Sequence, residues 1–209
     1  QDEAAQMGDL CLVVADQHVF HEYGGCRERA LRESAHHSHA GEGAGFDDVR
    51  AHKLQQFFLE NLPEQEKARV VHGDYGLHNC LTGPDSTVAA VVDWEISTLG
   101  DPLADLAYAL NFFPDPSDTI PISPEAATAV AGFPTRTEMA TRYGTRTGRD
   151  LSNLDYYTGF NRWKSACIVH GVYARYMEGK KSSEGVDLEH MRSRIEVSLE
   201  LSEEAVNRL

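Results

Sequence analysis

The sequence predicts an α+β fold in which helices dominate and one small β-hairpin carries polar side chains. Three features support this prediction. Two short β-rich runs flank a Gly83-Pro84 turn, apolar residues recur at helical spacing over most of the chain after residue 93, and capping residues precede those helical segments. The chain has 209 residues and 41% hydrophobic composition, and one domain is the default expectation at that length.

The first part of the chain should contain two helices separated by a loop. Residues 8–19 have apolar residues at roughly helical spacing. Residues 34–45 are rich in His, Gly and Ala, which indicates a surface loop; its three histidines, His36, His37 and His39, could bind a metal, but a solvated loop is favoured. Asp47 or Asp48 can then cap a helix that Pro63 ends.

The predicted strands surround a polar segment. Arg69, Val70 and Val71 form a β-rich run that leads directly into His72-Gly73-Asp74. The segments 80–82 and 87–92 read as the two strands of a hairpin. After Asp93 the remainder of the chain looks helical.

Three helical regions follow. Asp101-Pro102 opens a helix with an apolar face, and the prolines between 114 and 124 indicate an extended connection. Thr135 and Glu138 form a possible capping box for a helix that ends near Gly148. A long helix should run from about Ser152 to Gly179, and another should follow Asp187 with Met191, Ile195 and Leu199 facing inward. The expected core stripe of the long helix is Tyr157, Phe160, Lys164, Ile168, Val172 and Tyr176.

Composition limits the function classes. A formal net charge of -14 and a pI near 5.0 disfavour nucleic acid as a partner, because such a surface repels phosphates. No apolar run is long enough to predict a membrane span, and the acidic N-terminus does not resemble an export signal. The four cysteines form no CxxC pair, which suits reduced thiols. The expected location is the cytoplasm.

Asp74, Asn79 and Asp93 have the residue types and spacing of a phosphoryl-transfer site. Transfer to a hydroxyl needs a carboxylate that orients the acceptor and takes its proton, and oxygen ligands that hold magnesium. Asp74 follows a strand, and Asn79 lies at the D-x-x-x-x-N spacing of a kinase catalytic loop. Asp93 ends the hairpin, where strand pairing should return it to Asn79. A lone His-Gly-Asp would more often be a tight turn, but the combination makes that reading improbable.

Three blocks, in order, carry a family resemblance: HGDYGLHN at 72–79, VVDWE at 91–95 and STLGDPLADLAYAL at 97–110. They resemble the aminoglycoside phosphotransferase and choline kinase-like family, especially the kinase-like domains fused to some acyl-CoA dehydrogenases. The similarity continues through RYGTRTGRDLSNLDYY and GVYARYMEG, and covers roughly residues 8–209. The resemblance implies a protein-kinase-like fold and the use of Mg²⁺ with ATP or another nucleoside triphosphate.

The resemblance also implies roles for individual residues. It makes Asp74 the catalytic base and Asn79 and Asp93 the magnesium ligands. It gives the remaining positions supporting roles: His72 holds the loop by hydrogen bonds, Asp105 braces the loop backbone, Asp101 caps a helix, and Leu81 and Val92 lie under the adenine. Glu95 matches the family's DWE, and its role stays open between metal second shell and substrate contact.

The resemblance implies a small lobe that this sequence does not show. Such enzymes have a preceding sheet with a glycine-rich loop and a lysine that grips the phosphates. The 71 residues before His72 contain neither feature. Gln17-His18 resembles the end of the family's first large-lobe helix, so residues 1–209 are interpreted as the C-terminal catalytic lobe, with the other lobe expected upstream and little activity expected without it.

The expected function is ATP-dependent phosphorylation of a hydroxyl on a small molecule. The resemblance allows an aminoglycoside-like amino sugar, an amino alcohol or a hydroxyacyl thioester as acceptor; ATP versus GTP and the oligomeric state stay open. Two alternatives remain. One is a non-catalytic binding module derived from a kinase-like lobe. The other is a metal-dependent hydrolase that uses His72, Asp74, His78 and Cys80.

Overall fold

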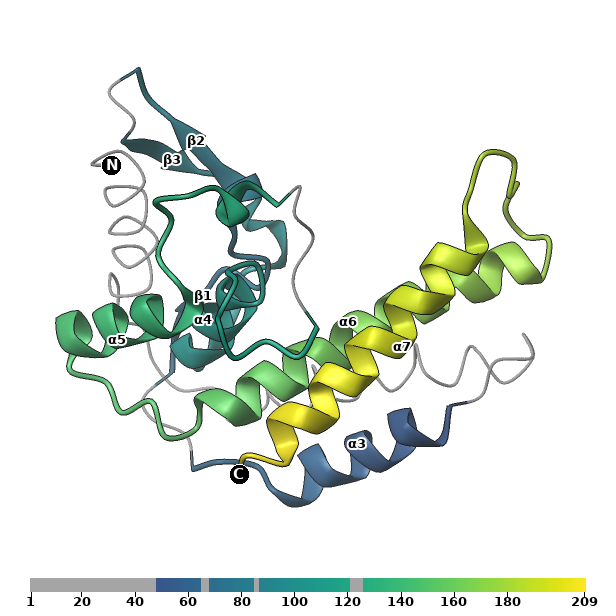
Figure 1. Ribbon diagram of the computed structural model, residues 1–209, viewed down its shortest axis with the longest axis horizontal. Coiled ribbons are helices and arrows are strands. Elements are labelled where there is room, and N and C mark those ends of the chain that lie inside the picture. The colour runs from purple at the N-terminus through teal and green to yellow at the C-terminus, as the bar shows by residue number, and fades with distance from the viewer. Residues whose placement is uncertain (1–47, 65–67, 85–86, 121–125) are drawn as a thin grey trace. The chain divides into compact units, whose positions relative to one another are not determined.

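The structure is a computed structural model that describes residues 48–64, 68–84, 87–120 and 126–209 (Figure 1). The helix expected at 8–19, with Gln17-His18, and the histidine-rich loop expected at 34–45 lie outside these residues. The described chain divides into two compact units, of which one contains residues 68–157 and the other contains residues 48–64 and 158–209. Within the described residues, no helix has both the length and the apolar character needed to cross a membrane.

Two small antiparallel sheets organise the first unit. In one, β1 (Arg69–Val71) pairs with β4 (Thr98–Gly100), with Val70 opposite Leu99. In the other, β2 (Cys80–Thr82) pairs with β3 (Val88–Val91), which confirms the predicted hairpin. The expectation that everything after Asp93 is helical was wrong at β4. That strand has only three residues and no alternation, and its pairing with a strand about 30 residues earlier leaves no local signal.

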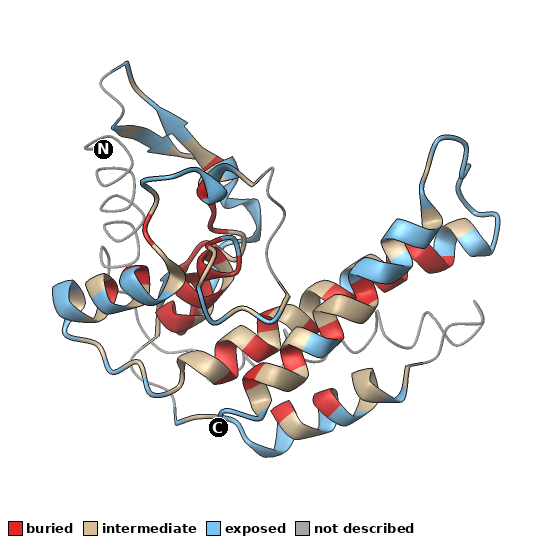
Figure 2. Ribbon diagram, in the orientation of Figure 1, coloured by how far each residue is buried: buried red, intermediate tan, exposed pale blue. Residues whose placement is uncertain are grey.

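Helix α4 (Pro102–Leu110) is the buried centre of the first unit and packs against β1 (Figures 1 and 2). Asp101 is its N-cap, because the carboxylate accepts a 3.0 Å hydrogen bond from the Leu103 backbone amide. Pro102 fits the first turn, where its missing amide hydrogen costs nothing. The predicted apolar face is buried: Leu103, Leu106, Ala107 and Leu110.

Helix α5 (Arg136–Thr147) begins at the predicted capping box. The Thr135 hydroxyl accepts from the Glu138 amide at 3.1 Å, and the Glu138 carboxylate accepts from the Thr135 amide at 2.8 Å. Gly148 ends the helix at a φ of 68°, as a C-terminal glycine in the left-handed region does. Between α4 and α5, the described residues hold turns and one 3₁₀ helix, η4 (Ala127–Ala129).

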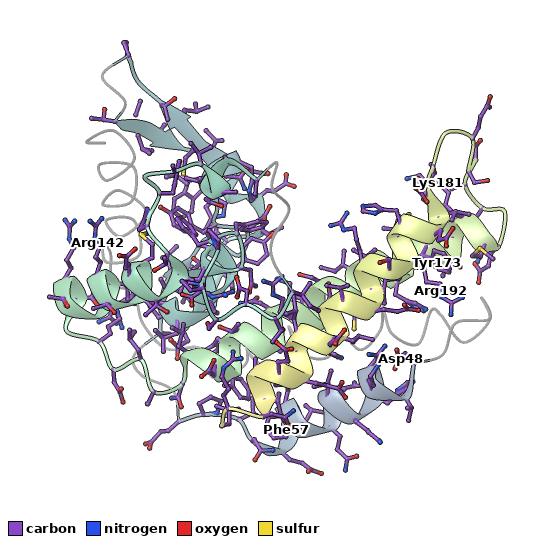
Figure 3. All side chains as sticks on the ribbon, viewed as in Figure 1. Asp48, Phe57, Arg142, Tyr173, Lys181 and Arg192 are labelled. Carbon is purple, nitrogen blue, oxygen red and sulfur yellow. The ribbon has the colours of Figure 1, made fainter. Side chains whose placement is uncertain are left out.

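The second unit consists of α3 (Val49–Glu60), α7 (Leu188–Val206) and α6 (Leu154–Met177) from Thr158 onward. Asp48, labelled in Figure 3, caps α3 by accepting from the Arg50 amide at 2.9 Å. The fully buried rings of Phe58 and Trp163 lie 6.0 Å apart, and the Trp163 indole donates to the Ala51 carbonyl at 2.9 Å. These contacts give the unit its own apolar core.

The predicted core stripe of α6 is confirmed at Tyr157 and is wrong at Ile168, and the other four residues are only partly buried. Ile168 is 45% exposed, and of the six expected residues Tyr157 alone is buried. The buried residues of the helix are instead Tyr156, Tyr157, Gly159, Asn161, Trp163, Ala166, Cys167, His170, Gly171, Tyr173 and Ala174. Apolar residues occur on several sides of this long helix, so the packing of its neighbours decides which side is buried.

Helix α7 begins where the sequence predicts. Asp187 accepts a 2.8 Å hydrogen bond from the His190 amide. Ile195 and Leu199 are buried as expected, while Met191 is partly exposed.

Candidate active site

The loop from His72 to Asn79 follows β1 directly and is held from α4. The Asp105 carboxylate accepts hydrogen bonds from the backbone amides of His72 at 2.5 Å and Gly73 at 2.8 Å. These are the contacts that bracing by Asp105 requires. Gly73 has a φ of 87°, and a Cβ there would lie 3.1 Å from the Ile96 carbonyl oxygen. Glycine therefore serves both the backbone conformation and the close approach.

A closed ring of four hydrogen bonds joins this loop to the end of the hairpin. The Asp74 amide donates to His72 Nδ1 at 3.3 Å, and His72 Nε2 donates to the Val92 carbonyl at 2.8 Å. The Val92 amide donates to the Asn79 carbonyl at 2.9 Å, and the Asn79 side-chain amide donates to the Asp74 carbonyl at 2.8 Å. The carbonyl can only accept and the amide can only donate, so the two contacts of His72 define a neutral ring with its proton on Nε2.

Two polar side chains lie beside the Asp74 carboxylate. His78 Nε2 lies 3.4 Å from its Oδ1, and the Asn79 amide nitrogen lies 3.4 Å from its Oδ2. Burial, followed by the interaction with the nearby Asp74 carboxylate, raises the pKa of Tyr108 on α4 above the usual range. One third of the Asp74 side chain remains exposed at 33%, so it is open to a ligand.

Asp93 follows β3 and has left-handed backbone angles, with φ 69° and ψ 49°. Within the described part of the chain it is the sole non-glycine residue with a positive φ. Such a conformation in a residue other than glycine is strained and often marks a functional position. The bond between Val92 and Asn79 brings the residue before Asp93 beside the other predicted ligand.

The residues present fit a magnesium ion. Asn79 is buried and uses its amide hydrogens on Asp74, so its amide oxygen is the atom suited to a cation. Asp93 exposes a carboxylate. Magnesium is usually bound by one or two such oxygen ligands together with phosphates and water. The assignment of both residues as ligands stays a prediction.

The other predicted positions surround this loop. Leu81 on β2 and Val92 after β3 are 54% and 37% exposed, which leaves apolar surface for a base, and their role under adenine stays a prediction. Glu95 lies in the exposed 3₁₀ helix η3 (Trp94–Ile96), and its role remains open. Asp101 caps α4 and also accepts from the Tyr157 hydroxyl at 2.9 Å, which is a structural role.

The hydrolase alternative requires ligands that are already engaged. Both ring nitrogens of His72 contact the backbone, and the Cys80 thiol donates to the Gly76 carbonyl at 3.4 Å. Burial raises the pKa of the Cys80 thiol, while a hydrogen bond with Tyr75 lowers it. Across residues 48–64, 68–84, 87–120 and 126–209, no group of three His, Cys, Asp or Glu side chains is placed to hold a metal. The structure therefore gives this alternative no support.

Sequence reasoning missed Tyr108 and Phe112. An aromatic residue in an apolar helix reads as core, yet the Asp74 carboxylate influences the pKa of Tyr108, and Phe112 is 41% exposed. The available signal was spacing, because residues 105, 108 and 112 recur at intervals of three and four and so share one side of a helix.

A separate groove of about 520 Å³ runs along the start of α5. Its lining includes Phe133, Thr137 and Arg142, and Figure 3 labels Arg142 on that helix. None of the predicted site residues lines it, so volume alone does not locate the predicted chemistry.

The fold and this loop define the class of the protein, a phosphotransferase-type chain of kinase-like fold. A crystal structure from Ralstonia eutropha, of a protein assigned as an aminoglycoside phosphotransferase, matches with a TM-score of 0.80 and 22% identity. The match covers 99% of this chain and 65% of that one. The chain belongs to the phosphotransferase enzyme family, whose profile matches residues 15–141.

Curated relatives are much longer proteins. Acyl-CoA dehydrogenase family member 11 from Homo sapiens is 33% identical over 148 residues, which are 68% of this chain and 19% of that protein. Acyl-CoA dehydrogenase family member 10 from Mus musculus is 37% identical over 136 residues, 63% of this chain and 13% of that protein. The chain thus spans about a fifth or less of the length of these relatives.

Proposed function

We propose that this chain is the catalytic-loop half of an ATP-dependent phosphotransferase that acts on a hydroxyl of a small molecule. The observation that carries the proposal is the closed ring of hydrogen bonds through His72, Asp74, Asn79 and Val92. It connects the proposed base, Asp74, with the proposed metal ligand Asn79 and with Val92, which precedes the other proposed ligand. Preorganised groups of this kind are the main source of catalysis in phosphoryl transfer.

In this proposal the Asp74 carboxylate orients the acceptor hydroxyl and takes its proton as the oxygen attacks the terminal phosphorus. The new O–P bond replaces the bond to the leaving diphosphate, which departs with the nucleoside. Asp105 keeps the loop in place through two backbone amides, so Asp74 needs no rearrangement before reaction. Asn79 and Asp93 would hold Mg²⁺, which when bound neutralises charge on the phosphates.

Nucleotide binding would use the exposed apolar side chains of Leu81 and Val92 under the adenine. ATP is the proposed donor, and no described residue distinguishes it from another nucleoside triphosphate. The net charge of -14 makes a bound metal more important here, because the chain's own surface disfavours a polyphosphate.

For the acceptor, we favour a hydroxyacyl thioester over an amino sugar or an amino alcohol. The relatives are named as acyl-CoA dehydrogenase family members, and the substrates of acyl-CoA dehydrogenases are acyl thioesters. The identity to the aminoglycoside phosphotransferase structure is 22%, which supports the fold and not its acceptor.

The decisive experiment measures Mg²⁺-dependent consumption of ATP with a panel of hydroxyacyl thioesters, amino alcohols and aminoglycosides. It uses the 209-residue chain and, where its gene encodes more, the complete product. Acceptor-dependent turnover that disappears in Asp74→Asn supports the proposal. Tight nucleotide binding without turnover on any acceptor would favour a non-catalytic binding module instead.

A further inference from the structure

The imidazole ring of His78 lies beside the Asp74 carboxylate. Its Nε2 is 3.4 Å from Asp74 Oδ1. An ionised carboxylate has only acceptors, so this nitrogen faces it with a hydrogen. The His78 side chain is 46% exposed, and the position of its ring therefore depends on what surrounds it.

Gly76 provides the space that this ring occupies. A Cβ at Gly76 would lie 2.6 Å from His78 Cε1 and 2.8 Å from His78 Nδ1, which is much closer than van der Waals contact. The backbone of Gly76 is extended, with φ -166° and ψ 174°, and residues with a side chain adopt this conformation as well. Room for the His78 ring is therefore the property of glycine that the loop uses here.

Phe112 restricts the ring from the end of α4. The two rings pack edge to face with 5.7 Å between their centroids. Phe112 packs in the same way on Tyr108, with 5.5 Å between centroids. Edge-to-face pairs stabilise ring orientation beyond simple burial. The His78 ring is thus fixed by a close backbone approach and by an aromatic partner, although half of the side chain is open to solvent.

We propose that His78 is a positioning residue for the Asp74 carboxylate. The inference rests on the proposed function of Asp74 as the base. His78 Nε2 lies beside Oδ1, and the side-chain amide nitrogen of Asn79 lies 3.4 Å from Oδ2, so each carboxylate oxygen has an N–H group next to it. Together the two contacts limit rotation of the carboxylate, while each oxygen keeps a lone pair for the acceptor hydroxyl.

The orientation of Asp74 matters to rate more than to nucleotide binding. A carboxylate that rotates freely spends less time in line with the acceptor, and small misplacements of a reacting group are costly. His78→Phe keeps an aromatic ring for Phe112 and removes the N–H group. It should lower kcat about three- to tenfold and leave the KM for ATP unchanged. His78→Gln keeps a donor group and should recover part of kcat.

The test measures kcat and KM in the complete gene product with Mg·ATP and the best acceptor of the panel. His190→Phe is the matched control, since it replaces an exposed histidine on α7 and should leave kcat unchanged. A parent-like kcat in His78→Phe overturns the inference, and so does an equal loss in His78→Gln. No turnover in the parent overturns the proposed function itself.

Gly76→Ala displaces the ring without changing any polar group. The His78 side chain can move toward solvent, so the fold should tolerate the substitution, and kcat should fall as it does in His78→Phe. In a His78→Ala background, Gly76→Ala should cause no further loss, because the ring that it displaces is gone. Losses that multiply in the double variant would show that Gly76 acts independently of His78 and would overturn the inference.

A further measurement does not need turnover. In ¹⁵N NMR of labelled histidine rings, the signal of each ring nitrogen depends on its hydrogen-bond partners. Asp74→Ala removes the carboxylate, so it should shift the His78 Nε2 signal and leave the signals of His190 in place. An unchanged His78 Nε2 signal would show that the ring does not contact the carboxylate and would overturn the inference.

Discussion

The Asp105 carboxylate accepts one hydrogen bond on each oxygen from the consecutive backbone amides of His72 and Gly73. A carboxylate provides acceptors at both positions, whereas an amide provides one acceptor and one donor group. Asp105 is only 8% exposed. The side-chain NH2 group of an asparagine at this position would therefore face a backbone amide without water as an alternative hydrogen-bond partner. The pairing therefore requires aspartate specifically.

Asp105→Asn should destabilise the chain by about 1–3 kcal/mol, because one buried amide loses its acceptor. Urea unfolding followed by circular dichroism measures this loss. Glu200→Gln on the exposed side of α7 is the control for a simple loss of charge and should stay close to the parent. Equal midpoints for the two variants would contradict the bracing role of Asp105.

Gly73→Ala should cost more than Gly148→Ala. Both glycines have a positive φ, at 87° and 68°, so both substitutions introduce backbone strain of order 1–3 kcal/mol. A Cβ at Gly148 meets no atom within 4 Å, whereas one at Gly73 lies 3.1 Å from the Ile96 carbonyl and 3.2 Å from its side chain. The difference between the two unfolding free energies isolates this close approach. Similar losses would mean that Ile96 moves away easily.

Asp93→Asn tests the predicted role of Asp93 as a metal ligand without disturbing its backbone conformation. Asparagine tolerates the left-handed region, so the free energy of unfolding should change little. Affinity for Mn²⁺ in the presence of ATP, measured by electron paramagnetic resonance, should fall by at least about tenfold. Loss of a residue that only hydrogen-bonds to a metal ligand already lowers metal affinity by about that factor. Unchanged Mn²⁺ affinity would remove Asp93 from the metal site.

Asp115 should make stability depend on pH in the acid range. Hydrogen bonds from Thr137 and Ser117 hold the pKa of Asp115 well below its usual range. A carboxyl whose pKa is lower in the folded state stabilises the fold above its unfolded pKa, near 3.9, and this contribution is lost as the pH falls further. Asp115→Asn should therefore destabilise at pH 7 and much less near pH 2. Urea midpoints at both pH values test this, and a constant difference would contradict it.

Local signals predicted the parts of the fold that local interactions form. The Thr135 and Glu138 pair gave the start of α5, and Asp101-Pro102 gave the start of α4, since each involves residues within one turn. The strand β4 has no such signal because its partner β1 lies far back in the chain. The prediction of which side of α6 is buried failed at Ile168 for a related reason. Trp163 and Ile168 are both apolar, and the packing of neighbouring helices buries the former and exposes the latter.

The residues of the candidate site were likewise predicted only where a local sequence signal exists. The loop residues Asp74 and Asn79 were found from their spacing, and the closed ring of hydrogen bonds brings them together with the residue beside Asp93. Tyr108 was missed, since its relation to Asp74 depends on how α4 packs on the loop, which no spacing within the HGDYGLHN block encodes.

His72 offers the most direct test of the ring itself. Its neutral imidazole donates to the Val92 carbonyl and accepts from the Asp74 amide, and the residue is 1% exposed. His72→Ala removes a donor and an acceptor together and should cost at least about 1–3 kcal/mol in the free energy of unfolding. It should also raise hydrogen exchange at the Asp74 amide, which loses its acceptor.

His72→Gln is the matched variant, because a glutamine side chain still carries one donor group and one acceptor. It should recover part of the stability and part of the protection at Asp74, which a purely apolar packing role for His72 would not produce. His72→Leu restores apolar volume without polar atoms, so it should resemble His72→Ala in exchange at Asp74 even where packing recovers stability. If His72→Leu instead protected the Asp74 amide as well as the parent does, the ring of hydrogen bonds would not be what holds the loop to the hairpin.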